Sequence, residues 1–240
     1  MTDNYVLVTG GSHNIGKAIS KRLSEDGFRV LILDITDPLH EHFSEFYKVD
    51  LSDADAAKSC LAELTAKYTI TGLVNNVGIV APAALEDVTL DDFERVLNTN
   101  ARAAILCTQA LLPTMREKRY GRIVSTASRV VLGKELRTSY CASKGAILSM
   151  SRTWALELAK YGITINCIAP GPIATTAFWK NNPPKSEQAK AIIANVPMKR
   201  MGNPDDIAHA TSYFMDERSG FVTGQVLYVC GGLTVGLAGA

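Results

Sequence analysis

The sequence contains few cysteines, five among 240 residues. Their number is odd, their spacing is wide and no Cys-x-x-Cys motif occurs, so the pattern excludes a disulfide framework and a zinc cluster. The four histidines do not form a ligand set either, and we expect no metal site. We expect the cysteines to be reduced core residues of a cytoplasmic protein.

The chain also lacks an excess of charge of either sign. Its 25 basic and 24 acidic residues give a formal net charge of +1, which leaves no electrostatic footprint for nucleic acid or for an anionic membrane. The first residues lack the basic and apolar regions of a signal peptide, so export is not expected. We therefore expect neither nucleic acid nor a membrane as a partner.

One segment without charged residues, 219–240, is about long enough to cross a bilayer. It holds six glycines, however, and the run Val226–Val229 followed by Gly231 and Gly232 is typical of a buried strand. We therefore expect no membrane span. A last core strand, with a tail packed on the body of the protein or on a neighbouring subunit, is the favoured interpretation.

Short β-branched runs alternate with helix-length amphipathic stretches along the whole chain. Strands that are apolar on both faces and separated by helices predict a parallel sheet covered on both sides. The expected fold is therefore α/β: a three-layer, doubly wound Rossmann fold with a mostly or wholly parallel central sheet. No composition break or repeat divides the chain, so we expect residues 1–240 to form one dinucleotide-binding and catalytic domain, with a substrate lid around 175–197.

A glycine-rich turn, Thr9–Gly16, follows the first strand and opens into a helical pattern. A strand, a glycine turn and a helix N-terminus together make an anion site, because free backbone N–H groups and the helix dipole face a pyrophosphate. Eighteen residues beyond Gly16, the second strand ends at Asp34. A carboxylate there can accept hydrogen bonds from ribose hydroxyls and repel a 2′-phosphate, which favours NAD over NADP. The competing interpretation of Asp34 is a helix N-cap or a solvated turn residue.

Three motifs in order resemble the short-chain dehydrogenase/reductase family along essentially the whole chain. Thr9–Gly16 resembles its Thr-Gly-x-x-x-Gly-x-Gly, Asn75–Gly78 its Asn-Asn-Ala-Gly, and Tyr140–Lys144 its Tyr-x-x-x-Lys. Each motif is common alone, but together they are specific. The resemblance implies the following cofactor-binding residues: Gly10, Ser12, Asn14, Ile15, Gly16, Asp34, Ile35, Asp50, Leu51, Asn76, Val77, Gly78, Thr126, Tyr140, Lys144, Pro170, Gly171, Ile173 and Thr175.

Three positions in the cofactor motifs depart from the family pattern. Asn14 stands where the family usually has glycine, and asparagine is the residue that best tolerates a positive φ after glycine. His13 occupies a place where NADP-preferring relatives often carry a basic residue, which weakens the argument from Asp34. Val77 replaces alanine and adds bulk without removing a polar group. We still expect NAD as the cofactor, with NADP as the less favoured one.

Tyr140 and Lys144 are four residues apart in 138–161, which reads as one long helix, so their side chains lie on one face. A free phenol has a pKa of about 10, too high for a base at neutral pH, but a neighbouring ammonium favours the phenolate. Tyr140 can then exchange the proton of an alcohol. The competing interpretation is a tyrosine and a lysine sharing a surface helix by chance.

The resemblance implies two further catalytic residues, Ser128 and Asn100. Ser128 lies at the end of a predicted strand, where its hydroxyl can hold a substrate carbonyl oxygen; Ser125 is the alternative. Asn100 matches the family residue that bends a helix and holds a proton-relaying water, and Asn98 competes for that role. With Tyr140 and Lys144 these residues predict an oxidoreductase that interconverts an alcohol and a carbonyl.

Two aromatic residues, Phe178 and Trp179, lie in the expected lid. If exposed, they would stabilise a hydrophobic ligand, so with Ser128 and Tyr140 they predict a small apolar or aromatic secondary alcohol or ketone as substrate. Alternatively, they only pack the lid onto the body. Apolar helical stretches suit the family's tetramer interfaces, and we expect a homotetramer, with a dimer as the alternative. The alternative functions are an NADPH-dependent 3-oxoacyl-carrier-protein reductase and a non-catalytic dinucleotide-binding module.

Overall fold

A computed structural model describes residues 4–236 of the chain. Its centre is a seven-stranded sheet in the order β3-β2-β1-β4-β5-β6-β7, and every neighbouring pair of strands is parallel. This confirms the predicted doubly wound α/β fold, with a wholly parallel sheet. The strands are β1 (Tyr5–Thr9), β2 (Arg29–Asp34), β3 (Glu45–Lys48), β4 (Ile70–Asn75), β5 (Gly121–Thr126), β6 (Ile163–Pro170) and β7 (Val226–Val229).

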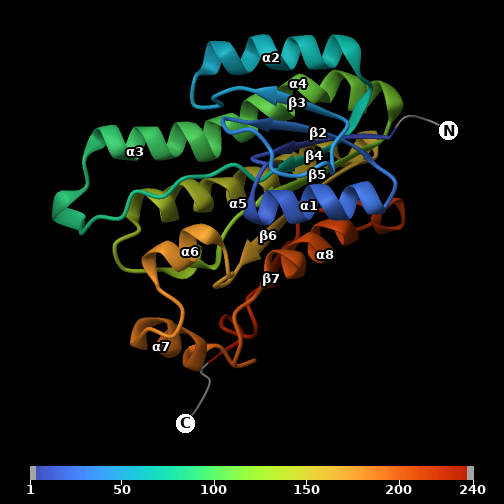
Figure 1. The fold of residues 1–240 in the computed structure, drawn as a ribbon. Helices are drawn as coiled ribbons and strands as arrows, with labels where there is room; N and C mark the ends of the chain where they lie inside the picture. The colour runs from blue at the N-terminus through green and yellow to red at the C-terminus, as the bar shows by residue number, and fades with distance from the viewer. Residues whose placement is uncertain (1–3, 237–240) are drawn as a thin grey trace.

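Helices cover both faces of the sheet (Figure 1). On one face lie α2 (Ala54–Lys67), α4 (Ala103–Lys118) and α5 (Thr138–Leu158). On the other lie α1 (Asn14–Glu25) and α8 (Pro204–Met215), which pack against each other. The remaining α-helices are α3 (Leu90–Leu97), α6 (Thr176–Asn181) and α7 (Glu187–Asn195), and the last two, drawn in orange, lie outside the three layers.

Alternation along each strand divides the core between the two faces. Leu7 of β1 points into the cluster under α2, α4 and α5, whereas its neighbours Val6 and Val8 point into the cluster under α1 and α8. Because successive side chains of a strand point to opposite faces, a strand buried on both sides must be apolar throughout. All five residues of β1 are buried, which explains why the sequence shows a continuous apolar run there.

The order in which the chain adds strands to the sheet reverses at β1, which pairs with β2 on one side and with β4 on the other. In an open α/β sheet, ligands bind at such a switch point, outside the carboxyl ends of the strands. The segments that follow β1 and β4 therefore meet at the edge of the sheet where a ligand is expected.

Two features of the fold differ in detail from the sequence prediction. The hydropathy pattern did not reveal β3, because this strand lies at the sheet edge and its residues are half-buried or exposed. The long helix predicted over 138–161 is present as α5 followed by a single 3₁₀ turn, Ala159–Tyr161.

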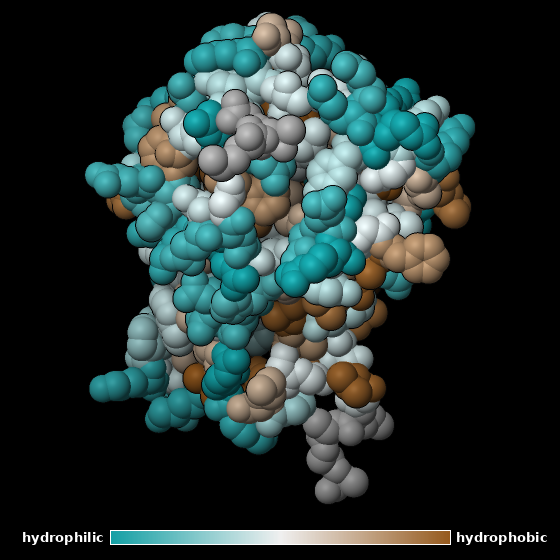
Figure 2. Space-filling view, turned by 90° about the vertical axis from the view of Figure 1, so that its right-hand side faces the viewer, coloured by the Kyte–Doolittle hydropathy of each residue, from teal (hydrophilic) through white to brown (hydrophobic). Residues whose placement is uncertain are grey.

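The uncharged C-terminal segment contributes β7, so the predicted strand is present. The expectation of a buried core strand is wrong, however, because β7 is an edge strand whose residues are half-buried or exposed. Among the described residues, the structure contains no helix that could span a membrane. The last part of the predicted tail, residues 237–240, lies outside the described residues. On the face in Figure 2, hydrophilic residues predominate and apolar residues occur in small groups.

Candidate active site

The predicted cofactor residues gather at the carboxyl ends of the strands. They follow or end β1, β2, β3, β4, β5 and β6, so the parallel sheet brings them to a single edge. The corresponding segments are 10–16, 34–35, 50–51, 76–78, Thr126 and 170–175.

The turn after β1 has the backbone shape that a close phosphate contact requires. Gly10 has a φ of 65° and Asn14 a φ of 48°, which confirms that Asn14 adopts the left-handed conformation expected of a glycine substitute. A Cβ atom on Gly16 would lie 1.8 Å from the carbonyl oxygen of Gly10. Only glycine fits there, and α1 therefore begins directly against the turn.

Hydrogen bonds tie this turn to the end of β4. The Thr9 hydroxyl accepts bonds from the backbone N–H groups of Asn76 (3.0 Å) and Val77 (3.1 Å). The Asn76 side-chain amide donates to the carbonyl oxygen of Gly10 (3.0 Å). The two motifs recognised in the sequence are thus parts of one rigid junction at the switch point.

Asp34 is held beside the same turn. Its carboxylate accepts bonds from the backbone N–H of Ser12 (3.1 Å) and of Thr36 (3.2 Å), while the Ser12 hydroxyl donates to the Thr36 carbonyl (2.8 Å). An ionised carboxylate has about four acceptor positions, so capacity remains for further donors. His40 adds a contact that the sequence did not indicate, because its Nε2 lies 3.0 Å from the carbonyl oxygen of Gly11.

A cavity of about 210 Å³ lies next to Asp34. Its walls include predicted cofactor residues from three segments, namely Asp34, Ile35, Asp50, Leu51 and Val77. A small heterocycle with apolar faces fits such walls. The cavity and the glycine turn therefore have the shapes that the adenine and pyrophosphate of a dinucleotide need.

Tyr140 and Lys144 lie one helical turn apart on α5, and Lys144 is only 2% exposed. The Lys144 ammonium donates to the carbonyl oxygen of Thr126 (2.6 Å) and lies 5.8 Å from the centre of the Tyr140 ring. Burial lowers the pKa of Lys144 to about 8. A Cβ on Gly78 would lie 3.2 Å from this nitrogen, so any side chain at position 78 would crowd the Lys144 ammonium.

Ser128 lies close enough to Tyr140 to affect the pKa of its phenol. Burial raises the pKa of the Tyr140 phenol, and the hydrogen bond with Ser128 opposes this shift, as does the positive charge of Arg137. Ser128 is buried and caps a short 3₁₀ turn, Arg129–Leu132, by accepting from the backbone N–H of Val130 (3.3 Å). The alternative residue, Ser125, lies within β5 and is bonded by Asn75 (3.4 Å).

Asn100 lies in a π-helical turn, Asn98–Arg102, between α3 and α4. Its side-chain oxygen accepts from the N–H of Ile79 (2.8 Å), and its amide donates to the Ile79 carbonyl (3.0 Å) and to the Ser143 hydroxyl (2.9 Å). Asn100 is buried, whereas its competitor Asn98 is half-buried. The interrupted helix directs Asn100 to the segment after β4 and to α5.

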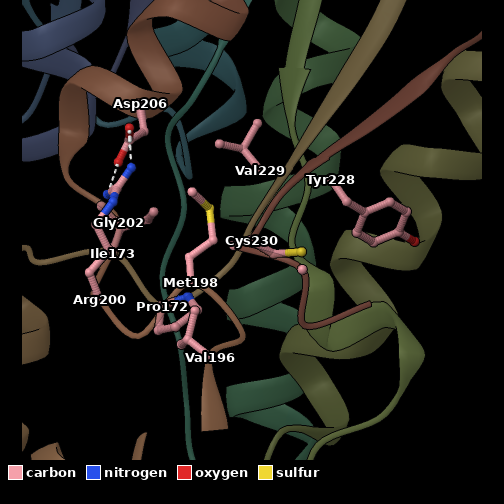
Figure 3. A pocket seen from close by; sticks show the side chains of 12 residues that line it. Pro172, Ile173, Val196, Met198, Arg200, Gly202, Asp206, Tyr228, Val229 and Cys230 are labelled. Carbon is pink, nitrogen blue, oxygen red and sulfur yellow. Dashed lines mark hydrogen bonds and ion pairs between the residues drawn. The ribbon is translucent and has the colours of Figure 1, made fainter. Parts of the chain in front are cut away.

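The segment after β6, residues 171–175, is anchored beside the neighbouring strand β7. A Cβ on Gly171 would meet the Cys230 backbone at 2.6 Å, so the loop after β6 packs closely against the end of β7. Pro172 and Ile173 also line a cavity of about 330 Å³ (Figure 3). Val196 and Met198 lie beside Pro172 there, and an Arg200–Asp206 ion pair (2.8 Å) closes another side. The sequence motifs did not indicate this second cavity.

Phe178 and Trp179 lie on α6 and are half-buried. Their rings pack edge to face, with centroids 5.0 Å apart, and the Thr175 hydroxyl caps the helix by accepting from the N–H of Phe178 (3.1 Å). The expectation of exposed aromatic side chains is thus wrong in part, because each ring covers the other. The part of each ring that stays accessible lies on the segment expected to cover a substrate.

The sequence interpretation missed a group of cations between Ser128 and Tyr140, namely Arg129, Lys134 and Arg137. Their charges were visible as a local excess of basic residues, but the chain as a whole is balanced in charge. Within residues 4–236, the structure contains no cluster of His, Cys, Asp and Glu side chains suited to hold a metal ion.

Comparisons with known proteins agree with this arrangement. Residues 10–234 match the family model described as enoyl-(acyl carrier protein) reductase. The (2S)-[(R)-hydroxy(phenyl)methyl]succinyl-CoA dehydrogenase subunit BbsD of Thauera aromatica is 38% identical, over 96% of each chain. The 3-oxoacyl-(acyl-carrier-protein) reductase FabG of Thermotoga maritima is 33% identical, over 95% of this chain and 97% of the relative.

Solved structures show the same similarity in three dimensions. A protein of Beutenbergia cavernae, described as an NAD(P)-dependent gluconate 5-dehydrogenase with NADP bound at low occupancy, superimposes with a TM-score of 0.91. It is 31% identical and covers 98% of both chains. Together with the parallel sheet and the junction at its switch point, these matches establish that the chain belongs to the short-chain dehydrogenase/reductase family of nicotinamide-dependent oxidoreductases, which act on CH–OH and C=O groups.

Proposed function

We propose that this enzyme transfers a hydride between NAD(H) and a secondary alcohol or ketone, with Tyr140 as the general acid/base. The observation that carries the proposal is the position of Tyr140 and Lys144 on one face of α5, beside Ser128 and facing the end of β5. A bound nicotinamide would supply or accept the hydride. Tyr140 would give or take the proton on the substrate oxygen, and the Ser128 hydroxyl would hold that oxygen.

Lys144 would support the phenolate form of Tyr140. Its ammonium donates one bond to Thr126, and two of its three N–H groups stay available for a ribose hydroxyl or a water. Asn100 would have a positioning role and would not donate a hydrogen bond to a ligand, because both N–H groups of its amide are bonded to Ile79 and Ser143. A proton-relaying water near Asn100 would therefore be held through a carbonyl oxygen.

The proposal of NAD as cofactor rests on Asp34. The Asp34 carboxylate is fixed beside the glycine turn by Ser12 and would repel the additional phosphate of NADP. A comparison with relatives favours NADP instead, because the Beutenbergia cavernae structure holds NADP. NADP is the alternative cofactor.

The proposed substrate is a small apolar or aromatic secondary alcohol or ketone, bound near Phe178 and Trp179. Support comes from the name of the Thauera aromatica relative, which specifies a hydroxyl group next to a phenyl ring. The second candidate is an NADPH-dependent 3-oxoacyl-carrier-protein reductase, which several FabG relatives favour. A non-catalytic dinucleotide-binding module is the third, and the complete Ser128, Tyr140 and Lys144 arrangement weighs against it.

Around this site we propose one catalytic domain over residues 1–240, with the 175–197 segment as a lid. We also propose a homotetramer in the cytoplasm. Support for assembly comes from large apolar side chains at the surface, such as Leu156 (85% exposed) and Phe221 (fully exposed), because such side chains mark interfaces when they lie together.

The test is a screen of secondary alcohols, ketones, dihydrodiols and acyl thioesters with NAD(H) and NADP(H), run on the wild type and on Tyr140→Phe. We expect NAD-linked turnover that falls by roughly 10²–10⁴-fold in the variant, because a general acid/base contributes that much. Cofactor binding, followed by fluorescence, should persist. Unchanged turnover in Tyr140→Phe would overturn the assignment of the acid/base, and a strong preference for NADPH would favour the reductase alternative.

A further inference from the structure

The loop 129–137, which joins Ser128 to α5, carries an unusual charge pattern. It contains three cations, Arg129, Lys134 and Arg137, and one acid, Glu135. The rest of the chain is close to neutral, with a net charge of +1 overall. The positive charge is thus concentrated between the two residues proposed to contact the substrate oxygen.

The backbone places these cations next to the site. Arg129 directly follows Ser128 and begins the 3₁₀ turn that Ser128 caps. Arg137 is the N-cap residue of α5, three residues before Tyr140, so its backbone lies within about one helical turn of Tyr140.

The loop is fixed to its surroundings. Its end pairs with the segment after β4, where Ala83 donates its N–H to the Leu136 carbonyl (3.3 Å) and bridges to Arg137. The Cys141 thiol donates to the carbonyl oxygen of Val130 (3.0 Å). The cations are therefore held on an anchored loop and do not depend on a ligand for their approximate position.

The three charges act on one another. Burial lowers the pKa of Lys134, and the charges of Arg137 and Arg129 lower it further. Arg137 also acts on Tyr140, whose phenol pKa it lowers against the effect of burial. Charges that interact in this way lie near one another, and Arg137 is the one among them that acts on the proposed acid/base.

None of the three cations forms an ion pair with another residue in 4–236. Glu135, next to Lys134 in sequence, is exposed and unpaired in the same part of the chain. Some other surface cations do pair with nearby carboxylates, as Arg95 does with Asp92 and Arg200 with Asp206; what distinguishes this loop is that three cations without an ion pair stand within nine residues. Like charges brought together without a counter-ion repel, and an anion between them relieves the repulsion.

We propose that Arg129, Lys134 and Arg137 form an anion-binding rim at the mouth of the site, which binds a carboxylate or phosphate group of the substrate. The rim rests on the proposed function, since the anionic group must belong to the molecule whose hydroxyl or carbonyl reaches Tyr140. Guanidinium groups bind carboxylate and phosphate oxygens through paired hydrogen bonds. The rim changes the proposed substrate class from an uncharged alcohol or ketone to an anionic hydroxy or oxo compound, either an acid or a coenzyme A thioester, with any aromatic part directed to the lid.

The test compares Arg129→Gln and Lys134→Gln with the wild type on matched substrates: a neutral secondary alcohol, a 3-hydroxy acid, a 3-hydroxyacyl-CoA and the corresponding N-acetylcysteamine thioester, which lacks phosphates. We expect each variant to raise KM for the anionic substrates roughly tenfold, the size of one lost charged hydrogen bond, with little change in kcat and none for the neutral alcohol. Arg129→Lys should recover part of the loss. Arg152→Gln, an exposed cation further along α5, is the control and should have no effect.

The substrate arms identify the anion. A KM effect with the CoA thioester alone indicates phosphate, and an effect with the hydroxy acid indicates carboxylate. Equal KM changes for neutral and anionic substrates, or no change for any, would overturn the rim. Calorimetric titration with succinate and with coenzyme A separates the two proposals: anion binding that weakens in the variants supports the rim even if no substrate is turned over, and that absence of turnover would count against the proposed function.

Discussion

Asn14 of the glycine-rich turn is joined to Thr176, the first residue of α6. The Asn14 side-chain oxygen accepts hydrogen bonds from both the backbone N–H of Thr176 (2.9 Å) and its hydroxyl (3.0 Å). Asn14 therefore does more than replace a glycine at a positive φ. It connects the turn proposed to bind the pyrophosphate with the segment proposed to cover the substrate.

Replacing Asn14 with glycine should loosen α6 without disturbing the turn. Glycine keeps the φ of 48° at no steric cost, but the two bonds to Thr176 are lost. Because a net hydrogen bond stabilises by about 1 kcal/mol, amide hydrogens of residues 176–182 should exchange roughly tenfold faster, as measured by hydrogen exchange and mass spectrometry. Asn14→Asp, which retains the acceptor oxygen, serves as the control. Equal exchange in Asn14→Gly and the wild type would contradict the link.

Lys144 should reduce the stability of the folded protein at neutral pH. Its pKa is lowered to about 8 by burial, from an ordinary value of 10.5. Folding therefore costs free energy at every pH at which Lys144 is protonated in the unfolded chain. The penalty is complete below about pH 8 and decreases as the pH rises to 10.5, above which both states are neutral. Lys144→Met should raise the free energy of unfolding at pH 7 by up to about 3 kcal/mol, while abolishing turnover.

The measurement is denaturant unfolding of the wild type and Lys144→Met between pH 7 and pH 10.5. The difference between the two proteins should shrink as the pH rises. Lys118→Met, at the exposed end of α4, is the control and should show no such trend. A constant difference over the whole range would show that Lys144 is not destabilised by burial.

Asp34→Ser should shift the cofactor preference toward NADP. The substitution removes the negative charge beside Ser12 and with it the repulsion of a 2′-phosphate. We expect the ratio of kcat/KM for NADP to that for NAD to rise at least roughly tenfold, a difference of about 1.4 kcal/mol. The control is Asp37→Ser, which removes a charge that is exposed and paired with Lys48 (2.9 Å). In this variant the ratio of kcat/KM for NADP to that for NAD should stay at the wild-type value. Identical ratios in both variants would exclude Asp34 as the selecting residue.

Gly16→Ala should weaken cofactor binding, because the added methyl group would lie 1.8 Å from the Gly10 carbonyl oxygen. The turn would have to move away from α1, so we expect the cofactor Kd to rise more than tenfold and the melting temperature to fall. Gly145→Ala on α5 is a matched control, since its Cβ meets nothing within 4 Å. It should stabilise the helix by roughly 0.5–1 kcal/mol. Normal cofactor affinity in Gly16→Ala would contradict the close packing of the turn.

Sequence patterns predicted the parts of this protein in which local signals agree. The apolar run of β1, the glycine turn and the start of α1 follow one another in the chain, and the structure contains them in that order. The long helix bearing Tyr140 was predictable for the same reason. The half-exposed edge strand β3 was not, because polar and aromatic residues at a sheet edge do not form a buried pattern.

Contacts between distant residues lay beyond the reach of sequence patterns. Asn14 and Thr176 are separated by 162 positions, and no periodicity connects them. The positive charges of Arg129 and Arg137 are visible in the sequence, but only the coordinates show that neither forms an ion pair within residues 4–236. The choice between Asn98 and Asn100 likewise depended on the π-helical turn, and no amino-acid pattern in the sequence predicts such a turn.

The π-helical turn over Asn98–Arg102 also restricts the length of the chain at that point. A wider turn accommodates one residue more than a regular helix would. Removing any one residue there would join α3 and α4 into one continuous α-helix and swing the Asn100 amide by about 100°, away from Ile79 and Ser143. Insertions and deletions, harmless in many surface loops, are therefore excluded from the middle of this helical segment, whatever amino acids they involve.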